Sequence, residues 1–306
     1  MDMSLQQLRM LREVAHRGTI AAAAESLGYT ASAVSQQLGG LEKATGVAVL
    51  ERVGRNVRLT DAGRELVRHA EELLRGMEAA QVAMERVGTE ARGVLDVTVY
   101  ESVAATLLAP LLADLAARHE GLELRTRQMD PDAAIDALAG GDIDLAFAID
   151  YPNAPAAPRD GVERYSIAWD RFHAVLPIDD PAPGPVVALT DLVDRPFIAS
   201  PPGLSCGRFL VAACRDAGFE PDIRHQLDDY PTSLHLVAAG QGVALVPDLG
   251  LVQVPPGLRI LDLDPPLSRT VQLAYRQASA TRPAVVAVRE SLERVVADLE
   301  LAPAAA

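Results

Sequence analysis

The first sixty residues carry apolar positions at helical spacing, interrupted by glycines. A first apolar row repeats every three or four positions and ends before Gly18; it comprises Leu5, Leu8, Leu11 and Ala15. This spacing predicts a helix with one buried face. Further along, two short β-prone stretches around Gly54 and Asn56 predict a hairpin, or wing.

Two more helices are predicted between the first helix and the hairpin. Thr19 and Thr30 are both placed to cap a helix, because a hydroxyl can accept a hydrogen bond from a free backbone amide at a helix start. The capped segments are residues 20–27 and about 31–44, with a turn at Gly28 between them. Two helices joined by a short turn that contains glycine are typical of a helix-turn-helix.

A longer helix is predicted over residues 61–87, about 40 Å in length at 1.5 Å per residue. Its apolar residues alternate between spacings of four and three, which is the heptad pattern of paired helices. The row comprises Leu66, Ala70, Leu73, Met77, Ala80, Met84 and Val87. Because the other faces are polar, we expect a dimerisation helix; a long core helix within a single chain is the alternative.

Strands and helices alternate after a hinge predicted between Gly88 and Gly93. This alternation predicts an α/β domain built of βαβ units around a mostly parallel sheet. The first series has strands at 94–100, 122–128 and 143–149 and helices at 102–119 and 131–138. After a connector at 151–160, the second has strands near 169–176, 197–199, 223–227 and 243–246 and helices near 204–217 and 231–239. A strand at 270–275 and a helix at 283–301 complete the chain.

Composition and charge narrow the class of protein. The 306 residues are 49% hydrophobic, which suits two or three domains with real cores. No apolar run reaches the roughly 18 residues that span a bilayer, and the first residues lack the pattern of a secretory signal, so we expect a cytoplasmic protein with no membrane partner. Cys206 and Cys214 are the only cysteines, so no disulfide framework is expected.

The net charge of −14 is unevenly spread along the chain. Residues 1–60 carry seven basic against five acidic side chains, whereas residues 91–306 carry 17 against 30. Charges beyond a Debye length, about 8 Å at physiological salt, are largely screened. An acidic remainder therefore does not exclude a DNA-binding head.

Residues 8–63 contain the run AAAAESLGYTASAVSQQL at 21–38, followed by Leu41-Glu42, Gly46-Val47, Leu50-Glu51-Arg52 and the run LTDAG at 59–63. In these residues and their order, the segment resembles the winged helix-turn-helix head of LysR-type transcriptional regulators. The resemblance implies a recognition helix from Thr30, a dimerising linker helix, and a two-lobed α/β effector domain like type II periplasmic binding proteins. It also implies double-stranded DNA with an interrupted palindrome as a partner, a homodimer or homotetramer, and RNA polymerase as a further candidate partner.

From this resemblance we place three parts along the chain. The DNA-binding domain is expected at 1–60, the linker helix and hinge at 61–90, and the effector-binding domain at 91–306. Within the last of these, the first lobe is expected at 94–163 and 267–306, and the second lobe at 164–266.

Short polar side chains on the recognition helix can enter the major groove, where Gln can pair with adenine through two hydrogen bonds. The residues expected to contact DNA from this helix are Thr30, Ser32, Ala33, Ser35, Gln36 and Gln37. Gly39 and Gly40 stand where the family often has a basic residue, so we expect the wing arginines to carry much of the phosphate binding. These are Arg52, Arg55 and Arg58. A solvated polar face, or a helix that ends or bends at Gly39-Gly40, is the alternative.

Two strand-to-helix turns suggest where an effector binds, because open α/β sheets bind ligands at such turns. The first turn carries Ser102, and the second carries Ser200, Pro202, Gly203, Leu204 and Ser205. The resemblance adds Gln128, Met129, Thr232 and Pro247. We expect a small polar or anionic effector between the lobes, although Ser102 could equally be only a helix cap.

Other functions stay open but are less favoured. Cys206 and Cys214 lie in a stretch resembling the redox segment of the family's peroxide-sensing branch, but Ser205 takes the place of the reactive thiol. Eight residues of helix rise about 12 Å, beyond the ~7 Å between Cα atoms that a disulfide allows, so redox sensing would require local unfolding. A solute-binding protein would explain residues 94–306 but not the first 90, and a regulator that senses no ligand is a further alternative.

Catalysis finds little support in the sequence. Residues 203–207 carry the G-x-S-x-G letters of hydrolases, which we attribute to chance. The six histidines show no metal-ligand spacing, so neither a metal nor a cofactor is expected.

Overall fold

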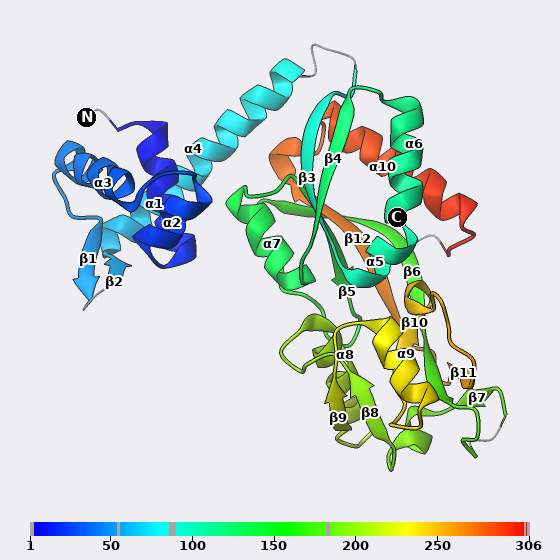
Figure 1. Ribbon diagram of the computed structural model, residues 1–306. Helices are drawn as coiled ribbons and strands as arrows, with labels where there is room; N and C mark the ends of the chain where they lie inside the picture. Colours follow the sequence, from blue (N-terminus) through cyan, green and yellow to red (C-terminus); the bar gives the residue numbers. More distant parts are fainter. Residues whose placement is uncertain (1–2, 54–55, 86–89, 182–183, 303, 305–306) are drawn as a thin grey trace. The chain divides into compact units, whose positions relative to one another are not determined.

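The computed structural model describes residues 3–53, 56–85, 90–181, 184–302 and 304. The chain forms two compact units, residues 1–88 and 89–306, which are drawn in Figure 1. Each unit is described by itself.

The first unit is a winged helix-turn-helix followed by one long helix. Its elements are α1 (Leu5–Arg17), α2 (Ile20–Ser26), α3 (Ala31–Thr45), the antiparallel strands β1 (Leu50–Val53) and β2 (Asn56–Leu59), and α4 (Asp61–Glu85). The predicted caps are confirmed: Thr19 Oγ1 accepts from the amide of Ala22 at 3.1 Å and Thr30 Oγ1 from that of Ala33 at 3.2 Å. Because α3 continues to Thr45, the alternative of an end at Gly39-Gly40 is wrong.

One apolar core holds the three short helices and the start of α4 together. Leu8 and Leu11 from α1, Ala23 and Ala24 from α2 and Val34, Leu38 and Leu41 from α3 are all buried there. Ala70 of α4 completes this core, and Leu66 packs against it. Because the buried residues of α3 pack against the other helices of the head, the orientation of its exposed side within the head is fixed.

The second unit is built around a mixed sheet of eight strands that runs through both lobes (Figure 1). In the first lobe β3 (Gly93–Val99), β4 (Leu122–Gln128) and β5 (Leu145–Asp150) are parallel. Helix α7 (Pro131–Gly140) covers the face that carries Ala146 and Ala148. Helices α6 (Leu108–Arg118) and α10 (Pro283–Asp298) cover the other face, where Leu145, Phe147 and Ile149 are buried.

Two long strands continue this sheet into the second lobe. Strand β12 (Ser268–Arg276) is antiparallel to β5 and to the first part of β6 (Val162–Pro177). The last part of β6 pairs instead with β10 (Ala244–Pro247) and β11 (Leu258–Leu263), and β7 (Val186–Val187) lies beside β11. β6 therefore belongs to both lobes.

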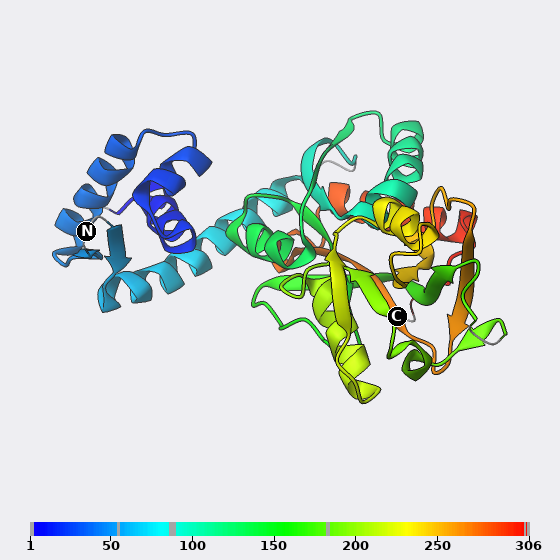
Figure 2. The same cartoon turned by 60° about the horizontal axis from the view of Figure 1, so that its bottom comes forward.

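The rest of the second lobe is smaller. Strands β8 (Pro196–Ala199) and β9 (Asp222–Gln226) are parallel, and helices α8 (Ser205–Asp216) and α9 (Tyr230–Ala238) accompany them (Figures 1 and 2). Short helical turns lie at Leu189–Leu192, Asp248–Gly250 and Gln277–Ser279.

Several predictions about this unit need correction. The sheet is mixed rather than mostly parallel, because β6 and β12 run antiparallel to their neighbours. The helix predicted at 102–119 is two helices, α5 (Glu101–Thr106) and α6, which meet at Leu107. Strand β6 begins at Val162 instead of 169, and its pairing with β12 as far as Arg171 extends the first-lobe sheet beyond residue 163. Strands β7 and β11 were not predicted.

Candidate DNA-binding face and effector cavity

The side of α3 that faces away from the head core is polar. Ser32, Ser35 and Gln36 are exposed, and Ala33 and Gln37 are half-buried, so the structure brings these predicted residues together on one helix. Lys43 is also exposed and follows Ser32 and Gln36 by eleven and seven positions, which places it on the same face. Lys43 was not among the predicted contacts, although its helical spacing could have shown it.

The wing supplies further positive charge beside the start of α4. Arg52 is exposed on β1, and Arg58 is exposed on β2, where its Nη2 atom lies 2.7 Å from Glu51 Oε1. That contact already partly neutralises Arg58. Gly54 and Arg55 lie outside the described residues.

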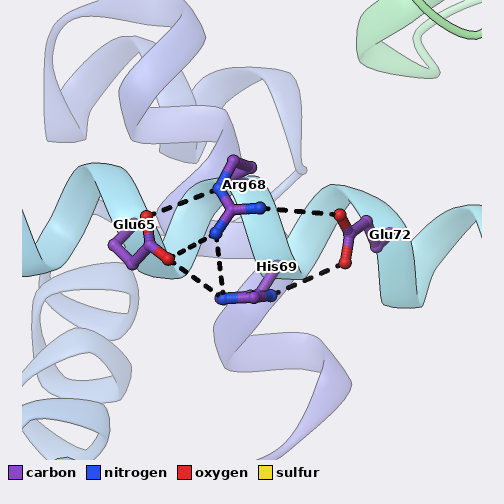
Figure 3. Close-up of polar contacts among 4 residues, drawn as sticks. All are labelled: Glu65, Arg68, His69 and Glu72. Carbon is purple, nitrogen blue, oxygen red and sulfur yellow. Dashed lines mark hydrogen bonds and ion pairs between the residues drawn. The ribbon is translucent and has the colours of Figure 1, made fainter.

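The first part of α4 carries a stripe of charged side chains that contact one another (Figure 3). Arg68 pairs with Glu65 and lies 3.8 Å from Glu72, and the ring nitrogens of His69 lie 3.2 Å from Glu65 and 3.5 Å from Glu72. Hydrogen bonding to Arg68 and the charge of its guanidinium lower the pKa of Glu65. These exposed charges are therefore largely balanced within the helix itself.

The predicted dimerisation row on α4 is divided by the structure. Ala70 is buried in the head core of its own chain, which leaves it no exposed surface for a seam with a second helix. Leu66 is half-buried and packs against the same core. Leu73, Met77, Ala80 and Met84 are exposed along the rest of α4, and Met84 is 72% exposed. Val87 lies outside the described residues.

A cavity of about 270 Å³ lies where the strands β3 and β4 end, and both lobes contribute to its walls. Of the predicted effector residues, Ser102, Gln128, Met129, Ser200 and Ser205 line it. Pro202, Gly203, Leu204, Thr232 and Pro247 do not. The structure places neighbouring residues on the wall instead, such as Tyr230 and Ser233 beside Thr232, because only some positions of each turn or helix can face one cavity.

A buried ion pair lies in the wall of this cavity and joins the two long strands. Arg269 on β12 donates from Nε to Asp170 Oδ2 on β6 at 2.8 Å, and from Nη2 to Ser102 Oγ at 2.7 Å. Asp170 Oδ1 also accepts from the amide of Leu249 at 3.1 Å. Burial, the largest effect, disfavours the charged form of Arg269, but the carboxylate of Asp170 and the hydroxyls of three nearby tyrosines together raise the pKa of Arg269 well above its ordinary value.

The remaining walls of the cavity are acidic and aromatic. Glu101 begins α5, Asp229 caps α9 by accepting from the amide of Thr232 at 3.2 Å, and Asp228 accepts from Ser200 Oγ at 2.8 Å. Burial raises the pKa of Glu101 to about 7, and the carboxylates of Asp229 and Asp228 contribute to this rise. None of the three acidic residues was predicted, since no local pattern marks side chains that meet only after folding.

Both cysteines lie on α8 as free thiols. Cys214 is buried, and this burial raises the pKa of its thiol to about 12. Cys206 lines the cavity, and its Sγ lies 3.4 Å from the hydroxyl of Tyr230. A helix places the two Cα atoms about 12 Å apart, which a disulfide does not span.

Neither a metal cluster nor a membrane-spanning helix is found within the described part of the chain. No group of three or more His, Cys, Asp or Glu side chains there could hold a metal ion. No helix there has the length and apolar character needed to cross a bilayer.

A DNA-binding head joined to a two-lobed domain with a cavity defines a class of ligand-responsive regulators, and comparisons identify the family. Residues 5–64 match the family model of bacterial regulatory helix-turn-helix proteins of the lysR family, and residues 88–297 match the LysR substrate binding domain. The chain therefore belongs to the LysR family, and it is a DNA-binding transcriptional regulator with an effector-binding domain.

Relatives and solved structures agree with this assignment. The transcriptional dual regulator GltC of Bacillus subtilis (strain 168) is 28% identical over 255 residues, which cover 83% of this chain and 84% of GltC. Full-length CbnR in complex with its target DNA shares the fold at a TM-score of 0.54, with 23% identity over 96% of this chain and 99% of CbnR. A hydrogen peroxide-bound mutant of Corynebacterium glutamicum OxyR shares it at a TM-score of 0.61, with 24% identity over 97% of this chain and 94% of OxyR.

Proposed function

We propose that this regulator reads DNA with the exposed face of α3 and holds the phosphate backbone with Lys43 and the wing arginines. The observation that supports this most directly is the row of Ser32, Gln36 and Lys43 on one exposed face, beside a hairpin that carries Arg52. Two heads related by a dyad would contact successive major grooves of an interrupted palindrome. The regulator acts in the cytoplasm, as a dimer or a dimer of dimers, and has no catalytic activity of its own.

Binding of the purified protein to its own upstream DNA, over a series of salt concentrations, tests this proposal. Gln36→Ala should cost about 1–3 kcal/mol on the specific site and relax selectivity, because a base contact is lost. Arg52→Ala should weaken binding to all sequences alike and reduce the salt slope by about one, because a phosphate contact is lost. Arg125→Ala, an exposed change on β4, is the control. Unselective binding by the unaltered protein, or no effect of either variant, would contradict the proposal.

The cavity between the lobes is proposed as the effector site. Its wall includes residues from both lobes and from β6 and β12, the strands common to both, so a ligand can favour one lobe arrangement over another. Ser102 connects the cavity to the buried Arg269. Ser102→Ala should therefore abolish or weaken the change in DNA binding that the small-molecule fraction of a cell extract produces. An unchanged response in Ser102→Ala and Ser205→Ala would contradict this location.

A thiol switch is the second candidate, and the likeness to the hydrogen peroxide-bound OxyR structure is the observation that favours it. The buried, neutral Cys214 and the separation of the two thiols along α8 argue against it. We expect peroxide treatment to leave DNA binding unchanged. A peroxide response that Cys206→Ser removes would establish the switch.

A further inference from the structure

The walls of the effector cavity carry a net negative charge. Among the described residues that line it are four carboxyl groups, Glu101 and Asp130 from the first lobe and Asp228 and Asp229 from the second, against the single guanidinium of Arg269. That guanidinium is paired with Asp170, and the side chains of both are at most 2% exposed. A carboxylate ligand would be repelled by these acidic side chains, and the one positive group that could attract it, Arg269, is already neutralised by Asp170. A cation would be attracted by the same acidic side chains.

Two of these acids are placed to hold a charge between the lobes. Glu101 and Asp229 are close enough that the carboxylate of Asp229 contributes to raising the pKa of Glu101, after burial itself. The two groups come from α5 in the first lobe and from the start of α9 in the second. Their mutual repulsion opposes closure of an empty cavity, and a positive charge between them would favour it.

Two residues of the cavity wall also carry buried polar atoms without partners. Within the described residues, neither Glu101 Oε2 nor the hydroxyl of Tyr100 has a hydrogen-bond partner, although both atoms are buried. Tyr100 is only 7% exposed and lies in the cavity wall. Buried polar groups normally have hydrogen-bond partners, so these two oxygens are candidates to accept hydrogen bonds from a ligand.

The apolar part of the wall is aromatic. The chain has only five Phe and six Tyr residues, yet Tyr100, Phe172, Phe209 and Tyr230 all line this one cavity. The rings of Phe172 and Phe209 stack with their centroids 4.5 Å apart, and Tyr151 stacks on Phe209 at 4.6 Å. Such walls suit a flat ring, and aromatic faces also attract cations.

We propose that this cavity takes a small organic cation with an aromatic body, whose ammonium group lies between Glu101 and Asp229. The ammonium donates to Glu101 Oε2 and the Tyr100 hydroxyl, while the ring contacts Phe172 and Phe209. The inference rests on the proposed role of the cavity as the effector site, and it replaces the polar or anionic effector expected from the two strand-to-helix turns.

Three compounds of nearly equal size, benzylamine, benzyl alcohol and benzoate, test the charge directly. Calorimetry with the full-length protein should show that benzylamine binds at least about tenfold more tightly than either of the other two, a difference of about 1.4 kcal/mol. Glu101→Gln and Asp229→Asn should each weaken benzylamine by about tenfold or more and bring it close to benzyl alcohol. Asn is as good a helix cap as Asp, so the second variant removes charge while it keeps α9 capped. Glu123→Gln, an exposed change on β4, should leave the affinity unaltered.

The opposite results would overturn the inference. They are benzoate binding as tightly as benzylamine, benzylamine affinity that neither variant changes, or no binding of any of the three compounds at millimolar concentration. The response to cell extract separates this failure from failure of the effector site itself. If that response is lost in Ser102→Ala while benzylamine does not bind, the cavity is the effector site and only the ligand class is wrong.

Discussion

Glu101 is a half-buried carboxyl group whose titration affects the stability of the fold. Its pKa is raised from the ordinary 4.5 to about 7, first by burial and then by the charge of Asp229. The folded protein therefore holds a proton that the unfolded chain has released between about pH 4.5 and pH 7. Because the folded state binds more protons in that range, the free energy of unfolding falls as the pH rises through it.

Glu101→Gln should remove this pH dependence, since an amide does not titrate. Relative to the unaltered protein, the variant should gain stability progressively between about pH 4.5 and pH 7 and keep a constant gain above that. The gain is of order 2 kcal/mol, less than the full pKa difference corresponds to, because solvent partly screens this half-buried group. Urea unfolding followed by fluorescence of Trp169, the only Trp in the chain, reports on the effector domain alone. Glu123→Gln is the matched control; a stability difference for Glu101→Gln that is flat across this range would contradict the raised pKa.

For single residues, roles that depend on neighbours in the sequence could be predicted, whereas contacts between residues far apart in the sequence could not. Thr19 and Thr30 could be singled out because each caps a segment whose helical pattern starts at the next residue. Ser102, which the sequence places at a helix start, lies inside α5 instead, because that helix begins at Glu101. Arg269 and Asp170 are 99 positions apart, and nothing near either residue in the sequence marks it as buried or paired. Such pairs become visible only when β6 and β12 lie side by side.

Helices and strands of ordinary length were predicted closely, but a very short strand and a very long one were not. Helix α3 matches the expected range because Thr30 caps its start and Gly46 ends it. Strand β4 also matches, although only Leu122 and Leu124 give it an alternating apolar pattern. The two-residue β7 is too short to show any alternation. Strand β6 is 16 residues long and changes partners along its length, so its burial pattern changes too.

Gly63 fixes how the long helix α4 begins against the turn that precedes β1. A Cβ atom built on Gly63 would lie 2.1 Å from the carbonyl oxygen of Val49, which is backbone and cannot swing away. Gly63→Ala should therefore destabilise the head by about 1–3 kcal/mol, although Ala is the better helix former.

Gly39→Ala is the matched change on α3, because a Cβ there meets no atom within 4 Å. It should stabilise the head by up to about 1 kcal/mol. Hydrogen exchange of the amides in α1, α3 and α4 of the full-length protein measures both effects. Equal effects of the two variants on stability would show that the close contact between Gly63 and the Val49 carbonyl does not exclude a side chain at position 63.

For the whole molecule, we expect the exposed part of α4 to decide whether two heads act together. Leu73, Met77, Ala80 and Met84 form an apolar row that the chain's own head leaves exposed, beside the charged stripe of Glu65, Arg68, His69 and Glu72 (Figure 3). An apolar row flanked by charges is the arrangement of paired helices. The heptad pattern predicted the row, but only the structure shows that Ala70 is buried in the head core and that Leu66 packs against it.

Met77→Glu should shift the protein toward monomers and lower its affinity for a two-half-site DNA. In a symmetric pair each new carboxylate faces an apolar row that also carries its copy, so both burial and repulsion oppose association. Ala79→Glu adds the same charge to an exposed position on a different side of the helix and should leave assembly unchanged. Sedimentation measures the assembly state, and binding to DNA with one or two half-sites measures the consequence. Loss of binding to the single half-site as well would point to damage in the head rather than to lost pairing, and unchanged sedimentation of Met77→Glu would place the dimer contact elsewhere.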